Sequence, residues 1–207
     1  MDSLLLVFAK TPIAGTIKTR LANRIGTEKA LWIYNQLLKK TAVTLKEISP
    51  KVVVFYSGEH PNYFEPYFSA HKKIPQQGFD LGERMEGAFQ WGFDEGFKKI
   101  IVIGTDLWEV NDSLLKKAFE KLETHDYVIG PALDGGYYLL GMKKCTPSLF
   151  KNKKWSSETV LAATLSDLNE NTVFLLEEKN DIDTLEDLKN MPELYQGLKL
   201  KFNDRKE

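Results

Sequence analysis

Cysteine is almost absent from this chain, and several common catalytic motifs are missing altogether. Cys145 is the only cysteine in 207 residues, which excludes an internal disulfide and a cysteine-based zinc site. His60, His71 and His125 show no ligand spacing, which argues against a Ser-His pair or a histidine-bound metal. The sequence contains neither G-x-G-x-x-G nor G-x-S-x-G, and its GTIKT segment lacks the glycine that precedes lysine in a P-loop.

Charge and hydrophobic runs exclude two classes of partner. The chain has 28 basic and 29 acidic residues and a net charge of −1, so it has no global basic field for nucleic acid. No apolar stretch is long enough to cross a bilayer, and the run Leu4–Phe8 is shorter than a signal-peptide core and follows Asp2. We therefore expect a cytoplasmic protein with no nucleic-acid partner and no membrane insertion.

Apolar runs and turn residues predict a single α/β domain over residues 1–207. Neither a linker rich in proline, glycine or serine nor an internal repeat divides the chain. Strands alternate with helices in the first half, which favours a parallel sheet with helices on both sides, and two closely spaced strands around Leu133–Gly136 make the sheet mixed. We expect the charged tail after Phe202 to be frayed. Strands are expected at 4–8, 51–56, 74–78, 100–104, 126–131, 137–142 and 172–176, and helices at 27–47, 62–69, 80–96, 111–122, 156–168 and from 183 onward.

Cap residues are expected at several helix ends. Thr27 is a plausible N-cap of the first long helix, and Asp80 caps the helix that Gly96 ends. Ser156 or Ser157 would cap the helix before residue 168. These caps set the predicted boundaries.

The stretch Leu4–Leu21 is where we expect the functional site to begin. A strand buried on both faces leads into a loop with Gly15 and three basic residues, Lys10, Lys18 and Arg20. Glycine lets the backbone approach a ligand, and the basic side chains neutralise phosphate charge. The alternative is a solvated basic turn. For the whole stretch, we favour a phosphate site.

Asp106 directly follows the apolar strand at 100–104. A carboxylate in that position lies at the carboxyl edge of the sheet, where ligands bind in open α/β folds, and it is a suitable oxygen ligand for Mg²⁺ or Mn²⁺. It could instead cap a turn, but the next helix is expected to start only at Asn111 or Asp112. We therefore interpret Asp106 as a metal ligand.

A glycine turn followed by two tyrosines forms the third candidate. Asp134 and Gly135 are explained by a tight turn alone. Gly136, Tyr137 and Tyr138 exceed what a turn needs, since they would let a ligand approach the backbone while aromatic faces stack on a sugar or a base. Both interpretations stay open.

Two carboxylates precede the last predicted helix. Asp183 with Glu186 three residues later fits a capping box, whereas Asp181 has no such role. The two could also complete a metal site opposite Asp106.

Amides and one arginine gather before the helix that Asp80 caps. The paired side chains of Gln76 and Gln77, beside Gly78, suit the edge of a base, and Arg84, two residues after Gly82, suits a phosphate. Solvated surface is the alternative.

Five segments stand in a fixed order over nearly the whole chain: FAKTPIAGTIKTRLA, GTDLWEV, GPALDGGYYLLGM, KWSSETVL and NDIDTLEDL. Together they resemble the bacterial nucleotide-diphospho-sugar transferase-like proteins of the DUF2064 family, which includes radical-SAM/selenodomain-associated transferases. The resemblance implies a GT-A-like fold: a single-domain, Rossmann-like three-layer sandwich with a mostly parallel mixed sheet. It places the nucleotide in about residues 1–106 and the acceptor in about 107–207.

The resemblance also implies residue roles. Asp106 would hold the metal on the diphosphate, with Asp183 as a second ligand. The run Thr105–Trp108 departs from the D-x-D usual in glycosyltransferases, so the metal would depend more on Asp183 and the diphosphate itself. The residues implied around the phosphates are Ala9, Lys10, Gly15, Lys18 and Arg20. Those implied in the donor-sugar or acceptor pocket are Asp134, Gly135 and Gly136, with Trp155 and Glu158 on its far side.

Three functions are consistent with these residues. The first is a metal-dependent glycosyltransferase that moves a sugar from a nucleoside diphosphate sugar to a small acceptor, with Asp134 as the base. The second is a nucleotidyltransferase that couples an NTP to a phosphorylated small molecule and releases pyrophosphate. The third is a nucleotide-binding module without turnover. The released product, nucleoside diphosphate or pyrophosphate, separates the first two.

Overall fold

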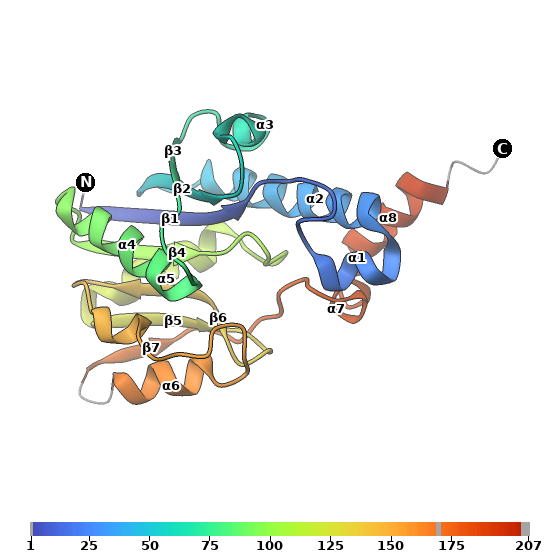
Figure 1. Ribbon diagram of the computed structural model, residues 1–207. Helices are drawn as coiled ribbons and strands as arrows, with labels where there is room; N and C mark the ends of the chain where they lie inside the picture. Colours follow the sequence, from blue (N-terminus) through green and yellow to red (C-terminus); the bar gives the residue numbers. More distant parts are fainter. Residues whose placement is uncertain (1, 169–170, 204–207) are drawn as a thin grey trace.

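The strands of the described residues form one mixed sheet. The computed structural model describes residues 2–168 and 171–203, and the end of the charged tail lies outside them. The strand order is β3-β2-β1-β4-β6-β5-β7, and within these residues β6 alone is antiparallel to its neighbours (Figure 1). The predicted α/β fold with a mostly parallel, mixed sheet is confirmed.

The strands and helices follow the predicted order closely. The strands are β1 Ser3–Lys10, β2 Lys51–Ser57, β3 Lys72–Pro75, β4 Lys99–Ile103, β5 Tyr127–Pro131, β6 Tyr137–Met142 and β7 Val173–Leu175. The helices are α1 Thr19–Ile25, α2 Thr27–Leu45, α3 Glu65–Phe68, α4 Leu81–Asp94, α5 Asp112–Thr124, α6 Val160–Asp167, α7 Leu185–Lys189 and α8 Pro192–Asn203, with 3₁₀ turns at Pro61–Phe64 and Pro147–Phe150. Each predicted strand is present, while α1 and the separate helix α8 were not predicted.

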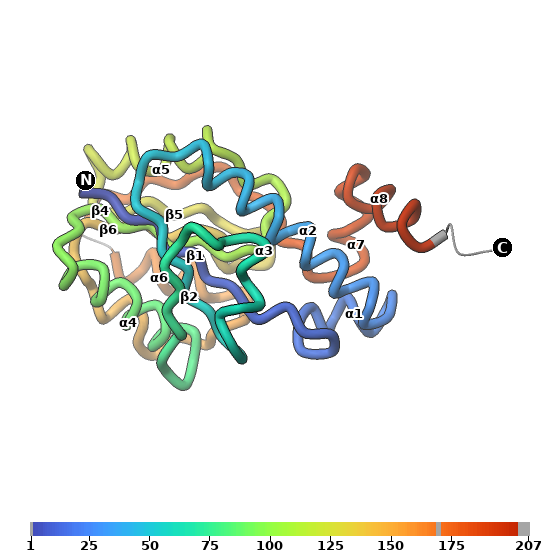
Figure 2. The backbone as a smooth tube through the Cα atoms, turned by 90° about the horizontal axis from the view of Figure 1, so that it is seen from above, coloured from blue at the N-terminus to red at the C-terminus, as the bar shows by residue number. Residues whose placement is uncertain are grey.

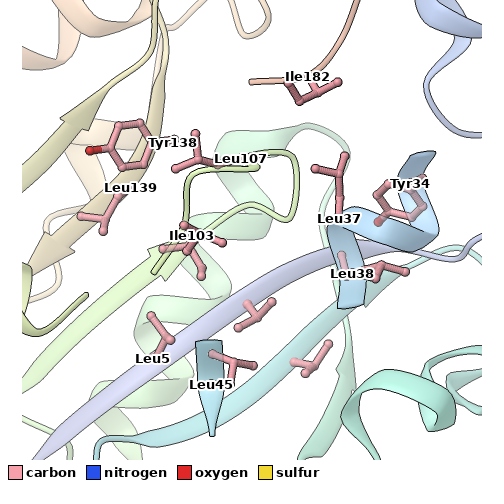
Figure 3. Packing of buried hydrophobic residues seen from close by; sticks show 14 of the residues in the cluster. Leu5, Tyr34, Leu37, Leu38, Leu45, Ile103, Leu107, Tyr138, Leu139 and Ile182 are labelled. Carbon is pink, nitrogen blue, oxygen red and sulfur yellow. The ribbon is translucent and has the colours of Figure 1, made fainter. Parts of the chain in front are cut away.

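Side chains alternate across β1 and fill a core on each face of the sheet. Leu5 and Val7 join one buried cluster, together with Leu37 of α2 and residues of α5. Leu4 and Leu6 join the other cluster, under α4 and α6. Figure 2 shows α2 and α5 on one side of the strands and α4 and α6 on the other, and Figure 3 shows the first cluster from close by. Because β1 is buried on both faces, it reads as a continuous apolar run in the sequence.

Some of the predicted helix caps are confirmed, and others are wrong. Asp80 caps α4 by accepting a hydrogen bond from the backbone N–H of Glu83 at 2.9 Å, and Gly96 follows the helix end with φ +89°. Thr27, in contrast, is the first helical residue of α2, because Gly26 occupies the cap position with φ +91°, which only glycine adopts easily.

The predicted start of α6 at Ser156 or Ser157 is also wrong. Ser156 has φ +63°, a left-handed conformation that cannot continue into a helix. Ser157 uses its hydroxyl to donate to the carbonyl of Lys154 at 2.6 Å. The helix therefore begins at Val160, and residues 156–159 form a turn.

The carboxyl ends of the six strands that run in one direction, all but β6, meet at one edge of the sheet. Beyond this edge lie α1, α7 and α8, which pack with the N-terminal part of α2 (Figure 1). The segment before α7 returns to the edge and is fixed there by a hydrogen bond from the backbone N–H of Ile182 to the carbonyl of Asp106, at 2.9 Å. Within the described residues, no helix combines the length and apolar character needed to cross a bilayer.

Candidate functional site

A pocket of about 890 Å³ lies along the carboxyl edge of the sheet. Its wall contains the loop after β1, the end of β4, the start of β6, the start of α4 and the turn before α6. Eight charged side chains of the described residues line it, and the two signs are balanced. The cations are Lys10, Lys18, Arg20 and Arg84, and the carboxylates are Asp106, Asp134, Asp181 and Asp183.

Lys18 lies between two of these carboxylates. Its Nζ is 2.7 Å from Asp106 Oδ1 and 2.9 Å from Asp183 Oδ1, and its side chain is only 3% exposed. Burial alone would lower the pKa of the Lys18 ammonium, but the two carboxylates outweigh it and raise the pKa. Lys18 is therefore a buried, charged link between the loop after β1 and the segment before α7.

Asp183 is free to bind cations because a different residue caps α7. The predicted capping box of Asp183 with Glu186 is wrong: the hydroxyl of Thr184 accepts from the N–H of Asp187, and the Asp187 carboxylate accepts from the N–H of Thr184 at 2.7 Å. Asp183 instead pairs with Lys18 and, at 2.5 Å, with Arg20 Nη2. Burial opposes ionisation, but Lys18 and Arg20 prevail and lower the pKa of Asp183.

Asp181 is a second carboxylate of this segment and has an unusual environment. Its Oδ1 is buried and has no hydrogen-bond partner within the described part of the chain. Burial, followed by the nearby charge of Asp106, raises the pKa of Asp181 to about 7. The sequence analysis gave Asp181 and Asp183 together as possible metal ligands, whereas the family resemblance implied this role for Asp183 alone.

Tyr34 of α2 holds the loop after β1 to the loop after β4. Its hydroxyl accepts from the backbone N–H of Lys10 at 2.8 Å, donates to the carbonyl of Lys10 at 3.0 Å, and lies 3.2 Å from Thr105 Oγ1. Burial and the charge of Asp106 raise the pKa of Tyr34, so the phenol keeps its proton. Its helical spacing in the sequence indicated only a core position.

The other end of the pocket is formed by the turn after β5 and the turn before α6. Asp134 Oδ1 accepts from the N–H of Gly136 at 2.9 Å, so Asp134 supports its own turn as well as facing the pocket. A Cβ on Gly135 would come within 2.2 Å of the carbonyl oxygen of Glu158, so the two turns pack backbone to backbone. Tyr137 and Trp155 add aromatic walls.

The start of α4 brings Arg84 to the pocket. Arg84 Nε donates to the carbonyl of Gly78 at 3.1 Å. Gly78 has φ +129°, and a Cβ there would approach Glu83 Cβ at 2.7 Å, so this turn requires glycine. Gly82 packs against the Trp155 indole, whose Nε1 is buried and has no partner among the residues described. These two glycines position pocket residues rather than line the pocket.

The structure brings most of the predicted site residues together. Pocket residues that the sequence analysis did not single out include Ser57, Ser157 and Val160; Ser57 ends a buried strand, the same signal that identified Asp106. Predicted residues on the pocket wall are Ala9, Lys10, Lys18, Arg20, Arg84, Asp106, Asp134, Gly136, Tyr137, Trp155 and Asp183. Gln76, the other member of the predicted amide pair, also lines the pocket. The predicted residues that lie away from the wall are Gly15, Gln77, Gly78, Gly82, Gly135 and Glu158.

The carboxylates fit a divalent cation in their chemistry. Asp106, Asp181 and Asp183 offer oxygen ligands of the kind that Mg²⁺ and Mn²⁺ prefer, one of these oxygens lacks a partner, and an ammonium already lies between two of the groups. As they stand in the structure, no three His, Cys, Asp or Glu side chains of residues 2–168 and 171–203 converge on one point. Lys18 occupies the space between Asp106 and Asp183.

Comparisons with known proteins find one family and one fold. The family model described as "Uncharacterized protein conserved in bacteria (DUF2064)" matches residues 40–157. A candidate nucleotide-diphospho-sugar transferase from Desulfovibrio desulfuricans G20 is similar at 33% identity and a TM-score of 0.88, over 92% of this chain and 86% of that one. No curated protein matches the sequence.

Two more distant structures share the fold alone. The inositol-1-phosphate CTP transferase of T. maritima is 15% identical, with a TM-score of 0.57 over 96% of both chains. Rv0371c of Mycobacterium tuberculosis H37Rv, crystallised with manganese, is 13% identical, with a TM-score of 0.61 over 93% of this chain and 99% of that one.

Proposed function

The chain belongs to the DUF2064 family, and we propose that it transfers a sugar from a nucleoside diphosphate sugar to a small acceptor, with Mg²⁺ or Mn²⁺ as cofactor. One observation carries the proposal: a single pocket joins a cationic loop and carboxylates at one end to a polar and aromatic wall at the other. Its volume of about 890 Å³ is within the range of small-molecule sites, about 300–1,000 Å³.

The cationic end suits the leaving diphosphate. Lys10 ends β1, Lys18 lies in the loop after it, Arg20 lies at the start of α1 and Arg84 comes from α4. Charge builds on the diphosphate as the glycosidic bond breaks, and cations already fixed in place stabilise that charge. We assign these four residues to the diphosphate.

The carboxylates nearest to these cations suit the metal. Asp106 and Asp183 would hold it, and the unpartnered Oδ1 of Asp181 is the next oxygen available. When bound, the ion would supply further positive charge to the leaving diphosphate. The D. desulfuricans relative is a candidate nucleotide-diphospho-sugar transferase, and the manganese in the M. tuberculosis structure agrees with a divalent ion in this fold.

The opposite end suits the acceptor. Asp134 faces the pocket beside Tyr137 and Trp155, where an aromatic wall can pack on a sugar ring. We assign Asp134 as the base that removes the proton of the acceptor hydroxyl. The hydrogen bond from the N–H of Gly136 holds this carboxylate in one orientation.

A nucleotidyltransferase is the second candidate. It is favoured by the number of cations: the four positive side chains on the wall suit a triphosphate as well as a diphosphate. The fold is also shared with the T. maritima inositol-1-phosphate CTP transferase. In this reaction an NTP would react with a phosphorylated small molecule and release pyrophosphate.

A thermal-shift panel followed by product analysis tests the proposal. The protein with Mg²⁺ is heated with UDP, GDP, CDP, ADP, their sugars and the matching triphosphates, and each ligand is repeated in EDTA. A ligand at 100 times its Kd adds about 2.7 kcal/mol of apparent stability. Stabilisation by one nucleotide sugar, with release of nucleoside diphosphate when acceptors are added, supports sugar transfer.

Three other outcomes overturn the first proposal. Selective stabilisation by one triphosphate, with release of pyrophosphate when phosphorylated alcohols are added, supports nucleotidyl transfer instead. If a nucleotide stabilises the protein but no acceptor gives a product, the result supports a nucleotide-binding module without turnover. No response to any nucleotide removes the diphosphate assignment itself.

A further inference from the structure

We propose that Lys18 acts as an internal counter-ion that closes the carboxylate site to free metal ions, so that the protein binds its divalent cation only together with a diphosphate. The preferred ligand is then the metal–nucleotide complex rather than either component alone. This inference rests on the proposed function, because it assigns the diphosphate and the metal to this pocket.

The first step is the position of Lys18. Its ammonium contacts Asp106 Oδ1 at 2.7 Å and Asp183 Oδ1 at 2.9 Å. A divalent cation bound between the two carboxylates would need these same two oxygens as ligands. An ion placed there would also face a neighbouring ammonium whose side chain is 3% exposed, and water screens such a repulsion poorly. Free metal therefore meets an occupied site.

The second step is the charge balance of the pocket. Four carboxylates and four cations line it within the described chain. A diphosphate that enters alone adds negative charge to a balanced site, and a divalent ion that enters alone adds positive charge. Entering together, the two largely cancel. The pocket wall thus favours the neutral combination over either partner.

The third step is where Lys18 goes. A lysine ammonium is a compact point charge on a flexible four-carbon stem, and phosphate oxygens are strong partners for it. Lys18 lines the pocket, so its ammonium can exchange the carboxylates for a bound diphosphate without leaving the site. Arg20 also pairs with Asp183, at 2.5 Å. Asp183 therefore keeps a cationic partner when Lys18 moves to the diphosphate.

Coupling of this kind is reciprocal. If the diphosphate raises the affinity for the metal by some factor, the metal raises the affinity for the diphosphate by the same factor. Removal of the Lys18 charge should abolish most of the coupling by opening the carboxylates to free metal. The change in affinity for metal alone is therefore the direct readout, and it requires no turnover.

Mn²⁺ binding to the full chain, followed by electron paramagnetic resonance of the free ion, tests this inference. Wild type, Lys18→Met and Lys73→Met are titrated with Mn²⁺ alone. Lys73 is a matched control because it also pairs with a carboxylate, Glu65 at 2.8 Å, with a side chain 9% exposed. We expect Lys18→Met to bind Mn²⁺ at least tenfold more tightly than wild type, and Lys73→Met to match wild type.

The titrations are repeated with the nucleoside diphosphate that most stabilises the protein, after subtraction of a protein-free Mn²⁺–nucleotide titration. Wild type should then gain at least tenfold in Mn²⁺ affinity, and Lys18→Met should gain less. Circular dichroism checks that the variants fold, and Lys18→Gln replaces Lys18→Met if the latter does not.

The inference and the proposed function fail in different ways. If wild type binds Mn²⁺ alone as tightly as the Lys18 variants do, the inference is wrong, while diphosphate binding still supports the proposed function. If no variant binds Mn²⁺ with or without diphosphate, the metal assignment of the proposed function is wrong, and the inference falls with it.

Discussion

Asp106 is the residue whose proposed role is best separated from the fold. Its side chain is 44% exposed and contacts the buried Lys18, so its loss removes one of the two ion pairs of that lysine. We expect Asp106→Asn to lower turnover by about 100-fold or more, because it removes fixed charge at the diphosphate. The free energy of unfolding should fall by only about 1–3 kcal/mol, because the buried Lys18 ammonium keeps its ion pair with Asp183. Initial rates and urea unfolding measure the two effects.

Glu109 supplies a matched control for this substitution. It lies three residues along the same loop, pairs with Lys179 at 2.9 Å and is 39% exposed, but it is not on the pocket wall. Glu109→Gln should therefore leave turnover close to that of wild type. An equal loss of activity in both variants, or unfolding of Asp106→Asn, would contradict the role of Asp106.

Asp181 gives the protein a predictable dependence of stability on pH. Its pKa rises from 3.8 to about 7 on folding, through burial and the charges of Asp106, Asp183 and Asp134, against the effect of Lys18. Between these values the folded state holds a proton that the unfolded state has lost. The free energy of unfolding therefore falls as pH rises from about 4 to 7, by up to about 4 kcal/mol at about 1.4 kcal/mol per unit.

Asp181→Asn isolates this effect, because asparagine does not titrate. Urea unfolding of the metal-free protein at several pH values should give a difference between wild type and variant that grows steadily from pH 4 to 7. Other groups cancel in that difference, including His71, whose pKa burial lowers, and Asp187, whose pKa is held low by Asn180 and Thr184 against the effect of burial. A constant difference over this range would show that Asp181 ionises normally.

At the scale of elements, α4 belongs to the helical layer on one face of the sheet, and its first turn lies on the pocket wall. A Cβ on Gly82 would lie 2.5 Å from the carbonyl oxygen of Phe150 and 2.6 Å from the Trp155 indole. Gly82→Ala must therefore push α4 away from Trp155. We expect a loss of about 1–3 kcal/mol in the free energy of unfolding, measured by urea denaturation, together with weaker ligand binding.

Gly87 offers the opposite expectation in the same helix. A Cβ there meets nothing within 4 Å, and alanine favours a helix over glycine by about 0.5–1 kcal/mol. Gly87→Ala should therefore stabilise the protein. If Gly82→Ala were as stable as Gly87→Ala, the close packing of α4 on Trp155 would be wrong.

The elements themselves were largely predictable from local patterns. Strands buried on both faces give unbroken apolar runs, and the cap at Asp80 is visible in the sequence because both partners of its hydrogen bond lie within four residues. The sequence did not show that Thr184, rather than Asp183, caps α7. Both residues suit an N-cap, and the choice depends on Lys18 and Arg20, more than 160 residues away along the chain.

The same argument explains what the sequence indicated about the site. Lys10 and Asp106 lie at the carboxyl ends of buried strands, and Asp134 lies in a tight turn. Their positions in the sequence are therefore enough to indicate them as site residues. Tyr34 and Trp155 act through partners that only the fold supplies, such as the backbone of Lys10. Glu158 packs its backbone against Gly135 and is not on the pocket wall, a distinction that a motif cannot make.

At the scale of the molecule, the pocket spans two halves of the chain along one sheet edge. Lys10, Lys18 and Arg20 come from the half at about 1–106, while Asp134 and Trp155 come from the half at about 107–207. We propose that the first half binds the nucleotide and the second binds the acceptor. Variants in the two halves should then separate binding from transfer.

Arg20→Gln and Asp134→Asn test this division. Arg20 is 65% exposed and pairs with Asp183, so we expect its loss to weaken nucleoside diphosphate binding by roughly five- to tenfold. Asparagine at 134 keeps an oxygen for the N–H of Gly136 but cannot act as a base. Asp134→Asn should therefore bind the diphosphate with a Kd within about twofold of wild type, while turnover falls about 10²- to 10⁴-fold. Calorimetry and initial rates measure both quantities. Because both residues line one pocket, a general disturbance of its shape would change binding and turnover together in each variant, and that result would contradict the division.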